Sequence, residues 1–127
     1  MDTMVCRFVT FDDDADTTEE ATHRLRLELH QLDAVRSVRQ PESATVAPDG
    51  SRAGELAELG TLLAVLAAQA DLVAGVLRLV GEWQRRRGRG RVEVRIGEHE
   101  LIVDDATADE QRRLIEAFID RVFPPER

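Results

Sequence analysis

The longest apolar stretch of the chain, residues 56–83, constrains the fold more than any other feature. Leucines recur in its first part at steps of three and four residues, at Leu56, Leu59, Leu63 and Leu66. Such spacing is typical of a helix that buries one side. Asp71, which precedes a second apolar series ending at Trp83, can accept hydrogen bonds from the free amides of a following helix. The stretch therefore predicts two helices, 52–68 and 72–87, folded as a hairpin, with one continuous helix as the alternative because no proline interrupts it.

The apolar character of the same stretch raises the question of whether it could cross a membrane. A helix that spans a bilayer needs about 20 predominantly apolar residues. The charge-free run here, residues 59–70, is much shorter and is followed by Asp71 and Arg78. We therefore expect residues 56–83 to form the core of a folded domain. A membrane-associated accessory protein that acts through these apolar helices is the alternative.

Composition and charge narrow the class of protein. Hydrophobic residues make up 43% of the 127 residues, which fits a single globular domain over residues 1–127. The formal net charge of −8 argues against a nucleic-acid partner, because phosphate backbones attract an excess of positive charge. The lone Cys6 excludes an intramolecular disulfide, and residues 1–3 lack the pattern of a secretory signal. A cytoplasmic location is expected.

The first part of the chain predicts a strand, a helix and a second strand. Residues 4–11 are apolar on both faces, as in a central strand covered on both sides, with Arg7 as the exception. A capping box at Thr17 and Glu20 predicts a helix over 18–31. Residues 34–39 predict a short strand, and such a strand–helix–strand unit favours a parallel crossover.

The part after the apolar stretch predicts a hairpin over residues 91–104. A turn at Gly97-Glu98 joins two strands, and glycine in first position suits a type II′ turn. That register places apolar pairs on one face and opposite charges on the other: Ile96 with His99, Val94 with Leu101, Val92 with Val103, Arg95 with Glu100, and Arg91 with Asp104.

A capping box at Thr107 and Glu110 predicts the last helix, over residues 108–123. The whole pattern indicates an α/β (α+β) fold in which a small mixed sheet of about four strands packs against helices. The expected order is strand, helix, strand, helix, helix, strand, strand, helix.

No group of residues predicts a catalytic, cofactor or metal site. His23 and His30 lie two helical turns apart, and His99 sits at a hairpin tip without a cysteine partner. The acidic run 12–16 lacks the glycine and glutamate that a calcium loop needs. Cys6 falls in a strand, where a buried thiol is inert. We therefore expect that the protein is not an enzyme. A small enzyme or ligand-binding domain remains the second alternative.

Five arginines near the end of the apolar stretch are the candidate partner-binding residues: Arg85, Arg86, Arg87, Arg89 and Arg91. Guanidinium groups hold phosphates or carboxylates through paired hydrogen bonds. Cations also suit the last turn of a helix, where they compensate the helix dipole. The second role alone could explain the cluster.

A family resemblance rests on the second half of the sequence. Residues 79–87, LVGEWQRRR, end a helical pair rich in leucine and alanine, and the strand Val92-Glu93-Val94 follows. A hairpin with Gly97 and a closing apolar helix complete the pattern. Over nearly its full length the chain resembles the family called effector-associated constant component, type one. It departs from that family at residues 67–71, where a glycine-rich turn would be expected.

The resemblance implies a non-enzymatic companion of bacterial conflict, or defence, systems. Such components are encoded beside effectors, often trypsin-like or caspase-like proteases, and beside signalling ATPases. The expected function is that of an adaptor or regulator that binds an effector or assembles with itself. The family offers no catalytic residues to carry over to this chain.

Overall fold

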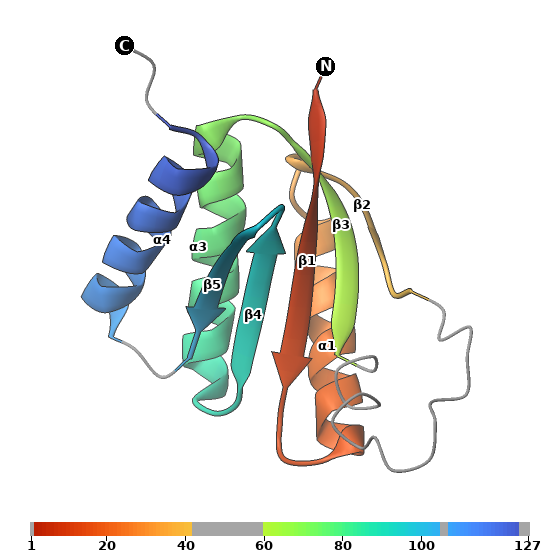
Figure 1. The fold of residues 1–127 in the computed structure, drawn as a ribbon. Coiled ribbons are helices and arrows are strands. Elements are labelled where there is room, and N and C mark those ends of the chain that lie inside the picture. Colours follow the sequence, from red (N-terminus) through yellow and green to blue (C-terminus); the bar gives the residue numbers. More distant parts are fainter. Residues whose placement is uncertain (1, 42–59, 105–106, 125–127) are drawn as a thin grey trace.

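Five strands and three helices make up the regular structure of the described part of the chain, which comprises residues 2–41, 60–104 and 107–124 of a computed structural model. Figure 1 shows their arrangement. In chain order they are β1 Thr3–Phe11, α1 Ala15–His30, β2 Val35–Arg39, β3 Thr61–Ala67, α3 Ala70–Arg87, β4 Arg91–Ile96, β5 His99–Val103 and α4 Ala108–Val122. The predicted α/β class is confirmed.

The five strands form one sheet in the order β2-β3-β1-β4-β5. Every pair of neighbouring strands is antiparallel, so the prediction of a mixed sheet is wrong, and the sheet has one strand more than the four or so predicted. β1 and β2 do run parallel, but β3 lies between them. The first strand in the chain is therefore the centre of the sheet (Figure 1).

The main correction concerns residues 61–67, which form strand β3 and not the end of a helix. The predicted helical hairpin 52–68 and 72–87, and the single long helix, are therefore both wrong; residues 52–59 lie outside the described residues. A strand with apolar side chains on both faces gives a nearly continuous apolar run, which periodicity cannot distinguish from a helix. The leucine spacing at Leu59, Leu63 and Leu66 fits both.

Helix α3 confirms the second predicted helix, with its start two residues earlier. Gln69 is its N-cap residue and makes no side-chain capping bond, whereas Asp71 lies in the first turn. The helix ends at Gly88, whose φ of 70° is the left-handed conformation that favours glycine. Arg85, Arg86 and Arg87 occupy the last turn, as the sequence predicts.

The start of α1 differs from the prediction. Asp14 is the N-cap, and its carboxylate accepts hydrogen bonds from the backbone N–H and the hydroxyl of Thr17, at 2.8 and 2.7 Å. The helix thus begins three residues before the predicted range, and the capping box at Thr17 and Glu20 is wrong. An aspartate three residues ahead offers the same type of cap, so the acidic run allowed either start.

The β4–β5 hairpin and α4 follow the predicted pattern closely. Val92, Val94 and Ile96 pair with Val103, Leu101 and His99, as the apolar pattern requires. Gly97 has a φ of 59°. Thr107 and Glu110 form the predicted capping box of α4. One pair differs, because Arg91 forms a salt bridge with Glu93, at 3.2 Å, and none with Asp104.

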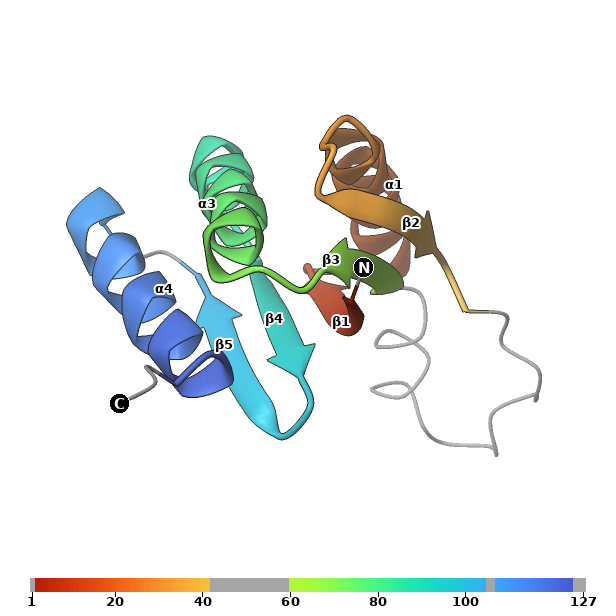
Figure 2. The ribbon, with the colours of Figure 1, turned by 90° about the horizontal axis from the view of Figure 1, so that it is seen from above.

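The helices cover one face of the sheet. In Figure 1, α1 lies behind β1 and β3, and α3 lies behind β4 and β5; Figure 2 shows both on the same side, with α4 against α3 and β5. The core lies between these layers and includes Cys6, Phe8, Leu25, Leu29, Leu62, Leu66, Val73, Leu77, Val80, Val94 and Phe118. Burial of each such side chain contributes about 1.5–3 kcal/mol. Among the described residues no helix lies over the other face, and none is long and apolar enough to cross a membrane.

Candidate interaction surface

The second face of the sheet presents a mixture of apolar and charged side chains. Strand residues alternate between faces, and the register places the partners of exposed residues on the same side. We call this side the uncovered face. Among its residues are Val5, Arg7, Val9 and Phe11 of β1, Arg39 of β2, Leu63 and Val65 of β3, Arg91, Glu93 and Arg95 of β4, and Glu100 and Ile102 of β5.

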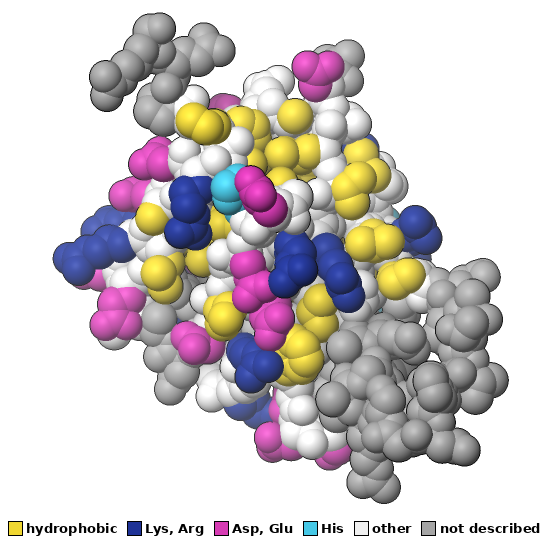
Figure 3. Space-filling view, in the orientation of Figure 1, with side chains coloured by type: hydrophobic (Ala, Val, Ile, Leu, Met, Phe, Trp, Pro, Cys, Tyr) yellow, Lys and Arg dark blue, Asp and Glu magenta, His cyan; other side chains and the backbone are white. Residues whose placement is uncertain are grey.

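Two apolar residues on the uncovered face are open to solvent. Val5 is 58% exposed and Ile102 is 43% exposed, and they are two of the four large hydrophobic residues with high exposure in the described part of the chain. Leu63, Val65 and Phe11 are partly buried. Figure 3 looks onto this side and shows hydrophobic side chains between basic and acidic ones.

One row of residues runs straight across all five strands. The strand registers place Arg39 opposite Leu63, Leu63 opposite Arg7, Arg7 opposite Arg95, and Arg95 opposite Glu100. We call these five residues the arginine row. Arg7 and Arg95 are direct cross-strand neighbours, and like charges in that position are destabilising. Figure 3 shows basic side chains side by side near the middle of this face.

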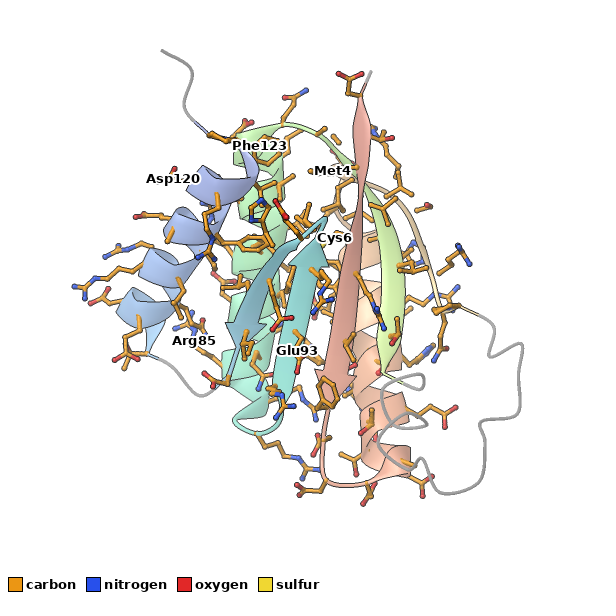
Figure 4. The ribbon with its side chains drawn as sticks, in the orientation of Figure 1. Met4, Cys6, Arg85, Glu93, Asp120 and Phe123 are labelled. Carbon is orange, nitrogen blue, oxygen red and sulfur yellow. The ribbon has the colours of Figure 1, made fainter. Side chains whose placement is uncertain are left out.

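A shallow hollow of about 150 Å³ lies beside this row. It is lined by Arg7, Val9, Phe11, Glu93, Arg95 and Glu100, all from β1, β4 and β5. Figure 4 labels Glu93 on β4, within this group of side chains. Val9, which is only 8% exposed, and Phe11 contribute apolar surface to the hollow, and the other lining residues carry both signs of charge.

Internal pairing neutralises some of the charge on the uncovered face. Arg95 forms a salt bridge with Glu100, and Arg91 forms one with Glu93 while its guanidinium lies 4.5 Å from the centre of the Phe11 ring. Arg7 and Arg39 have no ion pair within the described part of the chain. Two arginines of the row therefore face solvent without a carboxylate partner.

The five arginines predicted from the sequence are separated by the fold. Arg87 and Arg89 both bind the carboxylate of Asp12, Arg86 reaches Glu28 at 3.3 Å, and Arg91 lies on the uncovered face. Arg85, labelled in Figure 4, forms no ion pair with any described residue. Most of the cluster is therefore used to connect parts of the fold, and its role in partner binding stays a prediction.

Asp12 is the centre of that connection. Its side chain is 1% exposed and lies in the turn between β1 and α1, where it meets Arg87 in the last turn of α3 and Arg89 just after that helix. Burial disfavours the charged carboxylate and is the largest single influence on its pKa. Hydrogen bonds from Arg89 and the Asp13 backbone, with the positive charges of Arg87 and Arg89, outweigh burial and lower the pKa of Asp12 below its ordinary value.

Gln84 completes the same connection from inside the fold. The side chain is 3% exposed, and its amide nitrogen donates to the carbonyl oxygens of Arg89 and Gly90, each at 2.8 Å. Gly90 has a φ of 74°, and a Cβ at this position would lie 2.4 Å from the carbonyl oxygen of Phe11. The link between α3 and β4 is therefore fixed against the end of β1.

A larger hollow, of about 450 Å³, lies between α1 and α3. Leu27 and the mostly buried Trp83 contribute apolar surface, and Arg24, Arg86 and Arg87 contribute charge. All three arginines are paired, with Glu20, Glu28 and Asp12 respectively. Leu27 is 51% exposed, in agreement with its position off the buried stripe of the helix.

The histidines and the cysteine lie apart from one another. His23 and His30 are exposed on α1, and His99 is the first residue of β5, next to the hairpin turn. Within residues 2–41, 60–104 and 107–124, no group of three or more His, Cys, Asp or Glu side chains is placed to hold a metal ion. Cys6 is fully buried, and burial raises the pKa of its thiol, which keeps it protonated and unreactive.

Comparison with known proteins returned no match among family models, curated proteins or solved structures.

Sequence reasoning did not identify the arginine row. Its members come from five different strands, and only the strand order brings them together. One signal was present in the sequence, because Arg7 interrupts an otherwise apolar central strand. Its neighbours Leu63 and Arg39 could not be assigned to it while residues 61–67 were predicted as helix.

Proposed function

We propose that this chain is a non-enzymatic adaptor domain that binds a protein partner through the uncovered face. One observation carries the proposal: the described helices cover only one side of a sheet whose central strands are apolar on both sides. Antiparallel sheets with one solvated face normally alternate between apolar and polar residues. Val5, Val9, Leu63 and Val65 do not follow that alternation, because they are apolar on the uncovered face.

The apolar surface on this face supports binding to a protein. Contiguous exposed apolar patches with a polar rim are typical of interaction sites. Here the charged side chains of Arg7, Arg95, Glu93 and Glu100 lie among the apolar ones, and they would give a partner both orientation and specificity. The resemblance to effector-associated constant component, type one, makes a trypsin-like or caspase-like protease, or a signalling ATPase, the first partner class to test.

The test measures binding of the purified chain to the effector protein encoded beside its gene, by isothermal titration calorimetry. In the double variant Val5→Thr and Ile102→Thr, each apolar side chain is replaced by threonine, which is polar and β-branched and keeps strand propensity; it has the shape of valine and is one carbon shorter than isoleucine. We expect affinity to fall by about tenfold or more, because apolar contact area at the centre of an interface is lost. The melting temperature should change little, since exposed substitutions usually alter stability by less than about 0.5 kcal/mol.

Leu114 provides the matched control. It is 45% exposed, like Ile102, but lies on α4 and not on the sheet. Leu114→Gln should leave the affinity unchanged. Two results would contradict the uncovered face as the binding site. One is an unchanged affinity of the effector for the Val5 and Ile102 double variant, and the other is loss of binding in Leu114→Gln.

A further inference from the structure

We propose that the partner segment that covers the uncovered face is acidic, and that its carboxylates bind Arg7 and Arg39 of the arginine row. This inference rests on the proposed function and adds the chemistry of the partner. It starts from charge on the strand residues of the uncovered face, which are four arginines and two glutamates on a chain with a net charge of −8. The face is thus basic where the whole molecule is acidic.

The unpaired charges have a definite geometry. Neighbouring strands lie about 4.8 Å apart, so Arg39 and Arg7, two strands apart, are separated by roughly 10 Å at the backbone. Leu63 lies between them in the same row. A segment that carries two carboxylates about 10 Å apart with an apolar side chain between them would match this row. Each guanidinium can hold a carboxylate through two parallel hydrogen bonds.

The Arg7–Arg95 pair gives a second reason for a carboxylate. The two residues are direct cross-strand partners, and like charges in that position lower stability in the free chain. Glu100 neutralises Arg95, but the described residues supply no carboxylate for Arg7. A carboxylate that binds Arg7 would remove this repulsion, and the relief would favour the binding of an acidic partner.

Single-stranded nucleic acid is the competing anionic partner, and the face disfavours it. Nucleic acids that bind a sheet face stack bases on exposed aromatic rings. Phe11 is the only aromatic residue of the uncovered face, and the guanidinium of Arg91 already lies over its ring. Glu93 and Glu100 line the hollow beside Arg7 and would repel phosphates. A polypeptide can place apolar side chains there and direct its acids to the arginines.

The experiment uses the full chain and three probes, with binding followed by fluorescence anisotropy. The probes are a short peptide rich in glutamate and leucine, a twin with every glutamate replaced by glutamine, and an oligothymidylate. We expect the acidic peptide to bind, the glutamine twin to bind about tenfold more weakly or worse, and oligothymidylate not to bind. Raising sodium chloride from about 50 mM to about 500 mM should weaken the acidic peptide, because exposed charges are screened.

The double variant Arg7→Gln and Arg39→Gln identifies the site. It should reduce affinity for the acidic peptide about tenfold and make binding nearly independent of salt, while the melting temperature stays the same or rises. Arg113→Gln is the control, because Arg113 is an exposed arginine of α4 without a described ion pair, and it should bind as the unchanged chain does.

Three results would overturn the inference: equal binding of the glutamine twin, tighter binding of oligothymidylate, or full binding by the Arg7 and Arg39 variant. These results are separable from failure of the proposed function. An effector that binds the Arg7 and Arg39 variant normally but is lost with the Val5 and Ile102 variant would leave the uncovered face as the binding site and remove only its acidic partner.

Discussion

Asp12 joins two connections that are far apart in the sequence. Its buried carboxylate accepts hydrogen bonds from Arg87 and Arg89, which follow one another across the end of α3. The residue therefore fixes the turn between β1 and α1 to the link between α3 and β4. Arg87 and Arg89, which the sequence suggested as partner-binding residues, are thus used in salt bridges within the fold.

Replacing Asp12 with asparagine should lower the free energy of unfolding by about 2 kcal/mol, because hydrogen bonds to a charged group are lost and two arginines keep no carboxylate. Urea denaturation followed by circular dichroism measures the loss. Asp13→Asn is the matched control, because Asp13 is the next residue and its side chain is exposed. Equal stability of the two variants would show that the Asp12 contacts do not stabilise the fold.

The lowered pKa of Asp12 also predicts a dependence of stability on pH. A carboxyl group with a folded-state pKa below its unfolded value stabilises the fold at pH above the unfolded value, here an ordinary 3.8. This contribution is lost as the pH falls from 3.8 through the folded-state pKa. The stability difference between the unchanged chain and Asp12→Asn should therefore shrink below about pH 4. A difference that stays constant down to pH 2 would be inconsistent with this origin.

At the level of elements, most of the chain follows from its sequence. α3, α4 and the β4–β5 hairpin were predictable because charged residues mark their exposed sides and Gly88, Thr107 and Gly97 mark their boundaries. β3 was not, because no charged residue falls within Thr61–Ala67. The apolar side chains on both faces that hid this strand are the same ones that make the uncovered face a candidate interaction surface.

The capping box of α4 gives a test at this scale. Thr107→Ala removes the hydroxyl that accepts from the Glu110 backbone N–H at 3.2 Å. Loss of an N-cap of this type should lower the free energy of unfolding by about 1 kcal/mol. Thermal unfolding measures the change, with Glu116→Ala, an exposed position in the middle of α4, as the control. A Thr107 variant as stable as the control would mean that α4 adds little to the cooperative unit.

On the scale of the whole molecule, the described helices bury one side of the sheet and leave its other side without a helix. The helices pack against one face of the sheet and bury the core there. The strands contribute side chains both to that core and to the uncovered face, where we propose that a partner binds. Strand order was beyond sequence reasoning, because local pattern does not record which strands become neighbours. The arginine row depends entirely on that order.

The topology predicts how protection from hydrogen exchange is distributed. β1 pairs with β3 and β4, and β3 pairs with β1 and β2, so both are bonded on two sides. β2 is short, lies at an edge and has an irregular register between Val35 and Ser37. Native-state exchange followed by mass spectrometry should find β1 and β3 slowest and β2 faster, because edge amides open in smaller fluctuations. Peptides from β2 that exchange as slowly as those from β1 would contradict this order.

The central position of β1 has a consequence for synthesis on the ribosome. Both strands that flank it come later in the chain, β3 ending at Ala67 and β4 at Ile96. While the polypeptide is being made, the apolar side chains of Val5, Phe8 and Val9 in β1 therefore stay without their neighbouring strands until residues 61–67 and 91–96 have been synthesised. Such a delay leaves an apolar strand open to chaperones or to mispairing with another nascent chain.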